Sequence, residues 1–205
     1  MNILQQKARL YTKIRAFFDR CDTLEVDTPL LSPSTNTDVH IQSIQARVCG
    51  KDQYLQTSPE FAMKRLLAQG SGSIYQICHA FRDEEQGRVH RSEFSMLEWY
   101  SVDFDYVELM NQVEQLITEL TGKHQVFHRV RYFDAFFNAF GLDLQVASAD
   151  DLRQVVKQHI KGINVDQWSL NDCQDLLISQ VIAKQFQGFT FVYDYPAAQA
   201  SLARI

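Results

Sequence analysis

The feature that most constrains this chain is a pair of strand-like segments separated by a strongly charged stretch. The segments run from Ile74 to Phe81 and from Phe94 to Tyr100, and the stretch between them runs from Asp83 to Glu93. Apolar, aromatic strand patterns on either side of a polar stretch predict an antiparallel hairpin with a long loop. The fold therefore has to place such a hairpin against other elements that cover its apolar side chains.

The rest of the sequence predicts helices and further strands in an irregular order. Helical spacing and capping signals predict helices around residues 11–18, 59–70, 105–122, 132–140, 149–160 and 171–186. Extended segments are predicted at 24–29, 44–48, 53–56 and 189–195. Regular strand–helix–strand units are not evident, so the pattern favours an α+β fold, an antiparallel sheet with helices on one side.

Composition limits the possible functions of the chain and the compartment in which it is expected. The chain has 205 residues and a net charge of −5, with its 20 basic residues scattered, which predicts a single domain and argues against a broad nucleic-acid surface. The 4 cysteines lie far apart, which is more typical of free thiols in a reducing cytosol than of a metal site. Without a secretory signal or a membrane-spanning pattern, the prediction is a soluble cytoplasmic protein.

Alternation along the second strand of the hairpin places several polar side chains together. Phe94, Met96, Glu98 and Tyr100 share one face, and Arg82 and Glu84 share a face at the end of the first strand. Glu98 lies among apolar neighbours, so its carboxylate needs water or a cationic partner. The amine of a ligand is one such partner.

The charged loop can be interpreted in two ways. Between residues 82 and 93 it holds three arginines and a histidine beside four carboxylates. An arginine fork donates two parallel hydrogen bonds and suits phosphate, so the loop fits a nucleotide. From spacing alone, a solvated charged loop without a ligand is an equally good interpretation.

Three ordered motifs resemble those of the class II aminoacyl-tRNA synthetases in their lysyl form. Residues 81–84, 90 and 93–100 resemble motif 2, residues 24–29 resemble motif 1 with its proline at Pro29, and residues 57–60 (Thr-Ser-Pro-Glu) resemble the turn that binds the amino acid. Residues 191–196 and 201–203 extend the resemblance to the end of the chain. The resemblance implies the fold of that family, an antiparallel sheet flanked by helices.

Within the family, the chain resembles the branch that attaches β-lysine to elongation factor P. The sequence begins at the motif 1 helix, and residues 96–100 and 198–203 read as in that branch. The resemblance implies activation of (R)-β-lysine with ATP and transfer to a lysine of elongation factor P, with tRNA not expected as an acceptor. The alternatives are a lysyl-tRNA synthetase fragment and a non-catalytic binding or regulatory module, because fold alone does not fix function.

The resemblance implies a role for each site residue. Arg82 would hold the α-phosphate of ATP and the substrate carboxylate during catalysis. Other ATP contacts would come from Asp83, Glu84, His90, Arg91 and Phe94, where Phe94 would stack on adenine and His90 would meet the outer phosphates. The amino acid would be bound by Ser58, Pro59, Glu60, Glu98 and Tyr100, the last two around its side-chain ammonium.

Three of these residues keep an alternative. Phe94 can be a core residue, and Glu60 can simply favour the positive end of a helix dipole. Arg91 and Ser92 stand where the family usually has asparagine and proline, so Arg91 either contacts phosphate or points into solvent.

The resemblance also implies features that lie beyond residue 205. Motif 3 and the acidic Mg²⁺ ligands come later in the family. Residues 1–205 are therefore expected to be a partial catalytic domain with motifs 1 and 2 and without a metal site of their own. By itself the chain is expected to be catalytically inactive. Mg²⁺ is expected beside ATP in the complete enzyme, and a homodimer is expected through motif 1.

Overall fold

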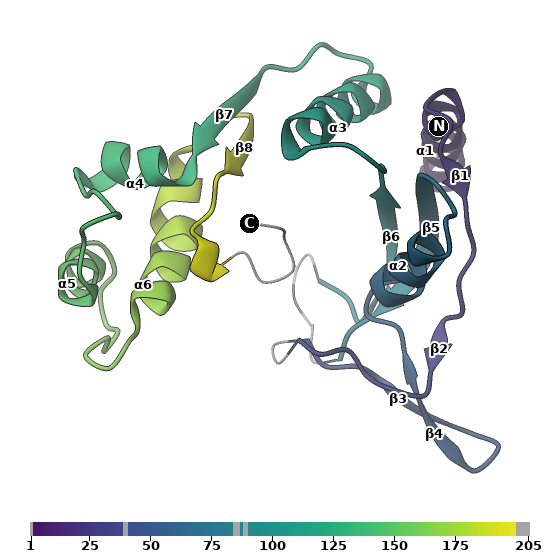
Figure 1. Ribbon diagram of the computed structural model, residues 1–205, viewed down its shortest axis with the longest axis horizontal. Coiled ribbons are helices and arrows are strands. Elements are labelled where there is room, and N and C mark those ends of the chain that lie inside the picture. Colours follow the sequence, from purple (N-terminus) through teal and green to yellow (C-terminus); the bar gives the residue numbers. More distant parts are fainter. Residues whose placement is uncertain (1, 39–40, 84–86, 88–89, 200–205) are drawn as a thin grey trace. The chain divides into compact units, whose positions relative to one another are not determined.

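The computed structural model describes residues 2–38, 41–83, 87 and 90–199 (Figure 1). The chain forms two compact units, residues 1–122 and 123–205, and each has its own hydrophobic core. Helices and small sheets are mixed in both units, which confirms the α+β fold class. The single catalytic domain expected over residues 1–205 stays a prediction.

The first unit contains all the predicted site residues. Its elements, in chain order, are α1 (Ile3–Arg20), β1 (Leu24–Glu25), β2 (Leu31–Ser32), β3 (Gln45–Val48), β4 (Lys51–Leu55), α2 (Glu60–Ala68), β5 (Ile74–Phe81), β6 (Glu93–Tyr100) and α3 (Tyr106–Thr121). One sheet has the order β1-β5-β6 and the other the order β2-β4-β3.

The predicted hairpin is confirmed as the antiparallel pair of β5 and β6. Its register runs from Ile74 opposite Tyr100 to Phe81 opposite Glu93. At the other edge of β5, β1 pairs in parallel, with Leu24 opposite Ile74. The sheet is therefore mixed, because the segment between β1 and β5 is long enough to cross over and return in the same direction.

One face of this hairpin is built into the core with α1 and α3, which lie side by side (Figure 1). The ring of Phe18 from α1 stacks on Tyr75 at 4.4 Å between centroids, and Trp99 lies 5.5 Å from Phe18. We call this face of β5 and β6 the core face, and it consists of Tyr75, Ile77, Leu97 and Trp99.

Local signals explain where the two long helices begin and end. Asn2 and Gln5 form a capping box, so α1 begins earlier than the apolar spacing alone predicts. Asp105 and Glu108 form the predicted capping box of α3, and Gly122 ends that helix with φ 66°. A positive φ is easily adopted by glycine, so Gly122 acts as the predicted stop.

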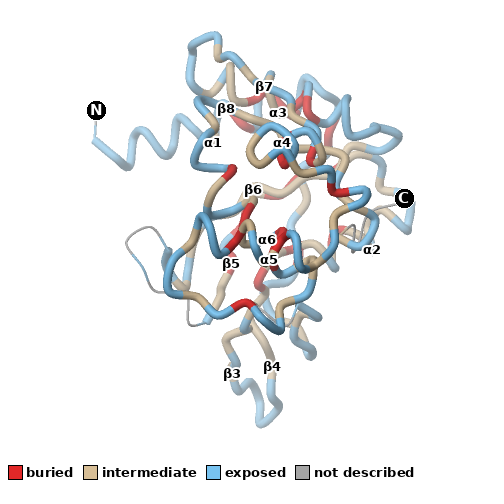
Figure 2. Tube along the Cα trace, turned by 90° about the vertical axis from the view of Figure 1, so that its left-hand side faces the viewer, coloured by how far each residue is buried: buried red, intermediate tan, exposed pale blue. Residues whose placement is uncertain are grey.

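The strands β3 and β4 form a hairpin that extends from the rest of the unit. Val48 pairs with Lys51 across the two-residue turn of Cys49 and Gly50, whose φ values are 51° and 76°. Such positive values are typical of tight hairpin turns. Figure 2 shows this hairpin mostly in the colours of exposed and intermediate residues, whereas much of β5 is buried.

The second unit packs helices against a two-stranded parallel sheet. Its elements are β7 (Phe127–Arg131), α4 (Tyr132–Phe140), α5 (Ala149–His159), α6 (Leu170–Leu177), a π-helix (Ile178–Ile182), short 3₁₀ turns (Ala183–Gln185 and Ala197–Gln199) and β8 (Phe189–Tyr193). The buried rings of Tyr132 and Phe136 lie at the centre of its core. Among the described residues, no helix has both the length and the apolar character that crossing a membrane requires.

The sequence prediction differs from the second unit in two places. The single helix predicted for residues 171–186 is instead α6 followed by a π-helix and a 3₁₀ turn. Strand β7 was not predicted, because its two apolar residues, Phe127 and Val130, do not alternate with its polar ones, and its partner β8 lies about sixty residues away.

Candidate functional site

The candidate site lies on the face of the hairpin opposite the core face. Residues that face each other in the register share a side of the sheet, and along each strand the sides alternate. We call this face the site face, and it consists of Ile74, Gln76, Cys78 and Ala80 on β5 with Tyr100, Glu98, Met96 and Phe94 on β6. Arg82 continues the same alternation just beyond β5.

Glu98 is the centre of the first group of site residues. The hydroxyl of Ser58 donates to Oε2 of Glu98 at 2.9 Å, and the hydroxyl of Tyr100 donates to Oε1 at 2.8 Å. Burial, and then the hydrogen bond to Glu98, raise the pKa of Tyr100 well above its usual range, so its hydroxyl stays protonated. Within the described part of the chain, Glu98 forms no ion pair with a lysine, arginine or histidine.

The turn before α2 links that helix to Glu98. The Ser58 hydroxyl also accepts from the backbone N–H of Glu60 at 3.0 Å, so a single side chain caps the helix start and positions the carboxylate. Pro59 is the N-cap residue of α2. Glu60 pairs with Lys64 one helical turn away at 2.6 Å, which agrees with a helix-stabilising role; its predicted role in binding stays a prediction.

Arg82 and Phe94 form the second group. The guanidinium carbon of Arg82 lies 5.3 Å from the centroid of the Phe94 ring, and Arg82 Nε donates to the carbonyl oxygen of Thr57 at 3.4 Å. A guanidinium over an aromatic face gains a cation–π attraction. Phe94 is only half-buried, so the structure places an aromatic ring and a cation together at an accessible end of the site face.

The loop residues predicted to contact ATP are less well defined by contacts. Asp83, His90 and Arg91 are exposed, and the backbone N–H of Asp83 donates to the carbonyl of Gln42 at 2.9 Å. Glu84 lies outside the described residues. The predicted roles of these four residues therefore stay predictions.

The sequence reasoning missed a buried polar pair on the site face. The hydroxyl of Thr28 donates to Oε1 of Gln76 at 2.9 Å, and both residues are buried. Gln76 lies directly opposite Glu98 in the register. The available signal was a glutamine within the apolar run of residues 74–78, where burial without a partner would be costly.

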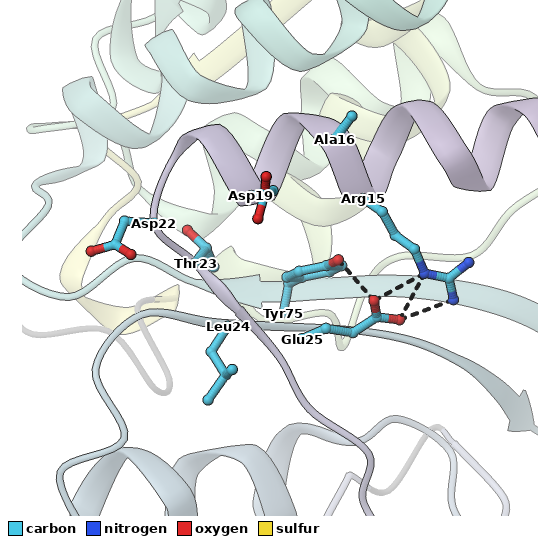
Figure 3. A pocket seen from close by; sticks show the side chains of 8 residues that line it. All are labelled: Arg15, Ala16, Asp19, Asp22, Thr23, Leu24, Glu25 and Tyr75. Carbon is cyan, nitrogen blue, oxygen red and sulfur yellow. Dashed lines mark hydrogen bonds and ion pairs between the residues drawn. The ribbon is translucent and has the colours of Figure 1, made fainter.

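A separate pocket of about 520 Å³ lies beside α1 and the core-face residue Tyr75 (Figure 3). Glu25 there accepts from Arg15 Nε at 2.9 Å and from the Tyr75 hydroxyl at 3.0 Å. The Arg15 hydrogen bond lowers the pKa of Glu25, whereas burial raises that of Tyr75 to about 12. The carboxylate is already neutralised, and none of the predicted site residues lines this pocket, so we do not choose it as the site.

A larger cavity of about 640 Å³ lies next to the Glu98 group. Its walls include Thr28, Thr57 and Ser58, together with Phe61 and Arg65 from α2. Among residues 2–38, 41–83, 87 and 90–199, no group of three or more His, Cys, Asp and Glu side chains is placed to hold a metal ion. We therefore assign no chemical step to Mg²⁺.

Among the proteins similar to this chain are several named elongation factor P–(R)-β-lysine ligase. It is 40% identical to the protein of Photobacterium profundum over 98% of this chain and 65% of the relative. It is 41% identical to that of Vibrio campbellii over 100% of this chain and 66% of the relative. The chain thus spans slightly less than two thirds of the length of these relatives.

The match to a protein family covers almost every residue of the chain. Residues 1–204 match the family described as tRNA synthetases class II (D, K and N). The resemblance inferred from the motif 1 and motif 2 residues is thereby confirmed, and the chain belongs to the class II tRNA synthetase family of the D, K and N group.

Proposed function

We propose that the protein activates (R)-β-lysine with ATP and transfers the resulting aminoacyl group to a lysine side chain of elongation factor P. The observation that carries the proposal is the Glu98 carboxylate, which two neutral hydroxyls hold on the site face. The names of the relatives support the same amino acid and the same acceptor.

The amine end of the substrate would lie beside Glu98. Ser58 and Tyr100 each occupy one lone-pair direction of the carboxylate and leave others available. Their hydrogen bonds hold the carboxylate in one orientation. An ammonium group would supply the charge that the neighbouring side chains do not, which makes a lysine-type substrate a better fit than a neutral amino acid.

The nucleotide end would lie at Phe94 and Arg82. Phe94 is four residues from Glu98 on β6, a separation of about 13 Å at the usual rise of a strand. Adenine would stack on the Phe94 ring, and the Arg82 guanidinium would pair with the α-phosphate and the substrate carboxylate. In this arrangement Arg82 belongs to the nucleotide end, and the carboxylate of the substrate would extend from Glu98 towards it.

The proposed reaction has two steps. In the first, a carboxylate oxygen of the amino acid bonds to the α-phosphorus of ATP, and pyrophosphate leaves. In the second, the neutral amine of the acceptor lysine bonds to the acyl carbon, AMP leaves, and the amine proton passes to solvent. Arg82 would stabilise the negative charge that accumulates around phosphorus in the first step, which is a contribution that depends on its position.

A homodimer through motif 1 belongs to the proposal. In that region α1 exposes Ile3 and Leu4, each 74% accessible, and β1 exposes Leu24 at 59%. A dimer through this region would cover these apolar side chains.

Pyrophosphate exchange in the full-length protein tests the amino acid, and transfer of labelled amino acid tests the acceptor. We expect exchange with β-lysine to exceed exchange with α-lysine, and the label to reach elongation factor P and not tRNA. Arg82→Ala should lower exchange by about two orders of magnitude, the usual effect of deleting a charge-stabilising donor. A preference for α-lysine with transfer to tRNA would favour the lysyl-tRNA synthetase alternative, and no exchange at all would favour the binding module.

A further inference from the structure

Gln76 carries a buried polar atom that the described residues leave without a partner. The residue is 1% exposed, and its Oε1 accepts from the Thr28 hydroxyl at 2.9 Å. Its Nε2 has no hydrogen-bond partner within the described part of the chain. Buried side-chain amides in folded proteins are almost always satisfied, so an unpaired one next to a binding site needs a reason.

The position of Gln76 suggests that reason. It lies on the site face directly opposite Glu98, and therefore in the same row of side chains as the carboxylate proposed to bind the ammonium. Burial, and next the charge of Glu98, raise the pKa of the neighbouring Cys78 to about 11. Gln76 is itself buried and lies opposite the Glu98 carboxylate, an environment in which a free amide group interacts strongly with a ligand.

The hydrogen-bond capacity of an ammonium group leaves room for Gln76. A primary ammonium has three N–H donors and no acceptor. Glu98 already accepts one hydroxyl at each oxygen, and the Tyr100 hydroxyl proton is directed to Glu98. A desolvated ammonium can donate one hydrogen bond to Glu98 and one to the Tyr100 oxygen. Its third N–H then still needs an acceptor.

Thr28 allows Gln76 to provide that acceptor. A threonine hydroxyl both donates and accepts, so the Gln76 amide can turn over and donate its Nε2 to Thr28. Its Oε1 then becomes the free atom on the site face. Both orientations keep one hydrogen bond between Thr28 and Gln76.

We infer that Gln76 is a specificity residue of the amine subsite, and that its side-chain oxygen accepts a hydrogen bond from the substrate ammonium beside Glu98 and Tyr100. This inference rests on the proposed function, because it requires a lysine-type substrate at Glu98. It adds a residue that discriminates a primary ammonium from a group with fewer donors.

The test compares two substrates in the full-length protein by pyrophosphate exchange. One is whichever of β-lysine and α-lysine the wild type activates, and the other is the analogue with a hydroxyl in place of the side-chain ammonium. Gln76→Met keeps the shape and removes the acceptor, and we expect the preference for the ammonium substrate in kcat/KM to fall about ten- to a hundredfold, with KM for ATP unchanged.

Gln112→Met is the matched control. Gln112 is also a buried glutamine of the first unit, but it accepts from Trp99 and Ser101 beside the core face. The Gln112→Met variant should be less stable than the wild type and keep the substrate preference. If Gln76→Met does not fold, Gln76→Glu decides, because it keeps an acceptor oxygen and should retain the preference for the ammonium.

The possible results separate the inference from the proposed function. An unchanged preference in Gln76→Met, an equal loss with both substrates, or a lost preference in Gln76→Glu would overturn the role of Gln76 while the proposed function stands. A wild-type protein that does not distinguish the ammonium substrate from its hydroxyl analogue, or whose preference survives Glu98→Gln, would overturn both.

Discussion

Replacing Glu98 with glutamine tests the amine subsite directly. The change keeps the shape of the side chain but leaves one oxygen to accept hydrogen bonds where Glu98 now accepts from both Ser58 and Tyr100. One hydroxyl can turn round and accept from the new amide, so the subsite should stay in place. What is lost is the negative charge that faces the substrate ammonium.

The size of the effect follows from the burial of this group. Removing one partner of a fully desolvated charge pair typically costs about 2–5 kcal/mol. Glu98 is only half-buried, so the lower end applies, and about 2 kcal/mol corresponds to about a 30-fold weaker binding of the amino acid. ATP binding should change little, because Phe94 and Arg82 lie about 13 Å along the strand.

Calorimetric titration of the full-length protein with each ligand separately measures both quantities. Glu93→Gln is the matched control, since Glu93 lies on the same strand but pairs with His79 on the opposite face. It should leave both affinities as they are. A comparable loss for the amino acid and for ATP in Glu98→Gln would refute the reasoning and make Glu98 a structural residue.

Three further predictions concern the nucleotide end, a helix cap and an ion pair. Phe94→Leu should weaken ATP binding by about 1–3 kcal/mol through lost stacking, as measured by titration, with amino-acid binding retained. Ser169→Ala should lower the free energy of unfolding by about 1 kcal/mol, measured by urea unfolding, because the Ser169 side chain caps α6. The control Ser179→Ala, in the π-helix, should be nearly neutral. The ion pair with Arg15 lowers the pKa of Glu25, so the pair stabilises the fold above the unfolded-state pKa and this stability is lost as pH falls through the lowered value. The advantage of wild type over Glu25→Gln in urea unfolding should therefore disappear between about pH 5 and about pH 2, and an advantage that grows on acidification would contradict it.

The elements that the sequence predicted well are those specified by neighbouring residues. The Asp105–Glu108 capping box and Gly122 determine α3 locally, and the alternation of β6 determines which side chains share a face. Elements that depend on distant partners were missed. Strand β7 is stabilised by pairing with β8, and no pattern within residues 127–131 reveals that partner.

The candidate site divides in the same way. Phe94, Glu98 and Tyr100 could be placed on one face because a strand alternates with a period of two. The contact of Ser58 with Glu98 joins positions forty residues apart, so only the family resemblance suggested that the two belong together. Gln76 was missed because its significance depends on an absent partner, which sequence does not show.

The arrangement of the hairpin has a consequence for how its sequence can change over generations. Tyr75 and Gln76 are adjacent, yet one belongs to the core face and the other to the site face. A single-residue insertion in β5 would exchange these roles and direct a polar amide toward Phe18 and a large ring toward Glu98. Such a variant would be eliminated for failing to fold before its activity mattered. Selection for stability alone therefore preserves the spacing of the site residues, even in a lineage where the activity is not under selection.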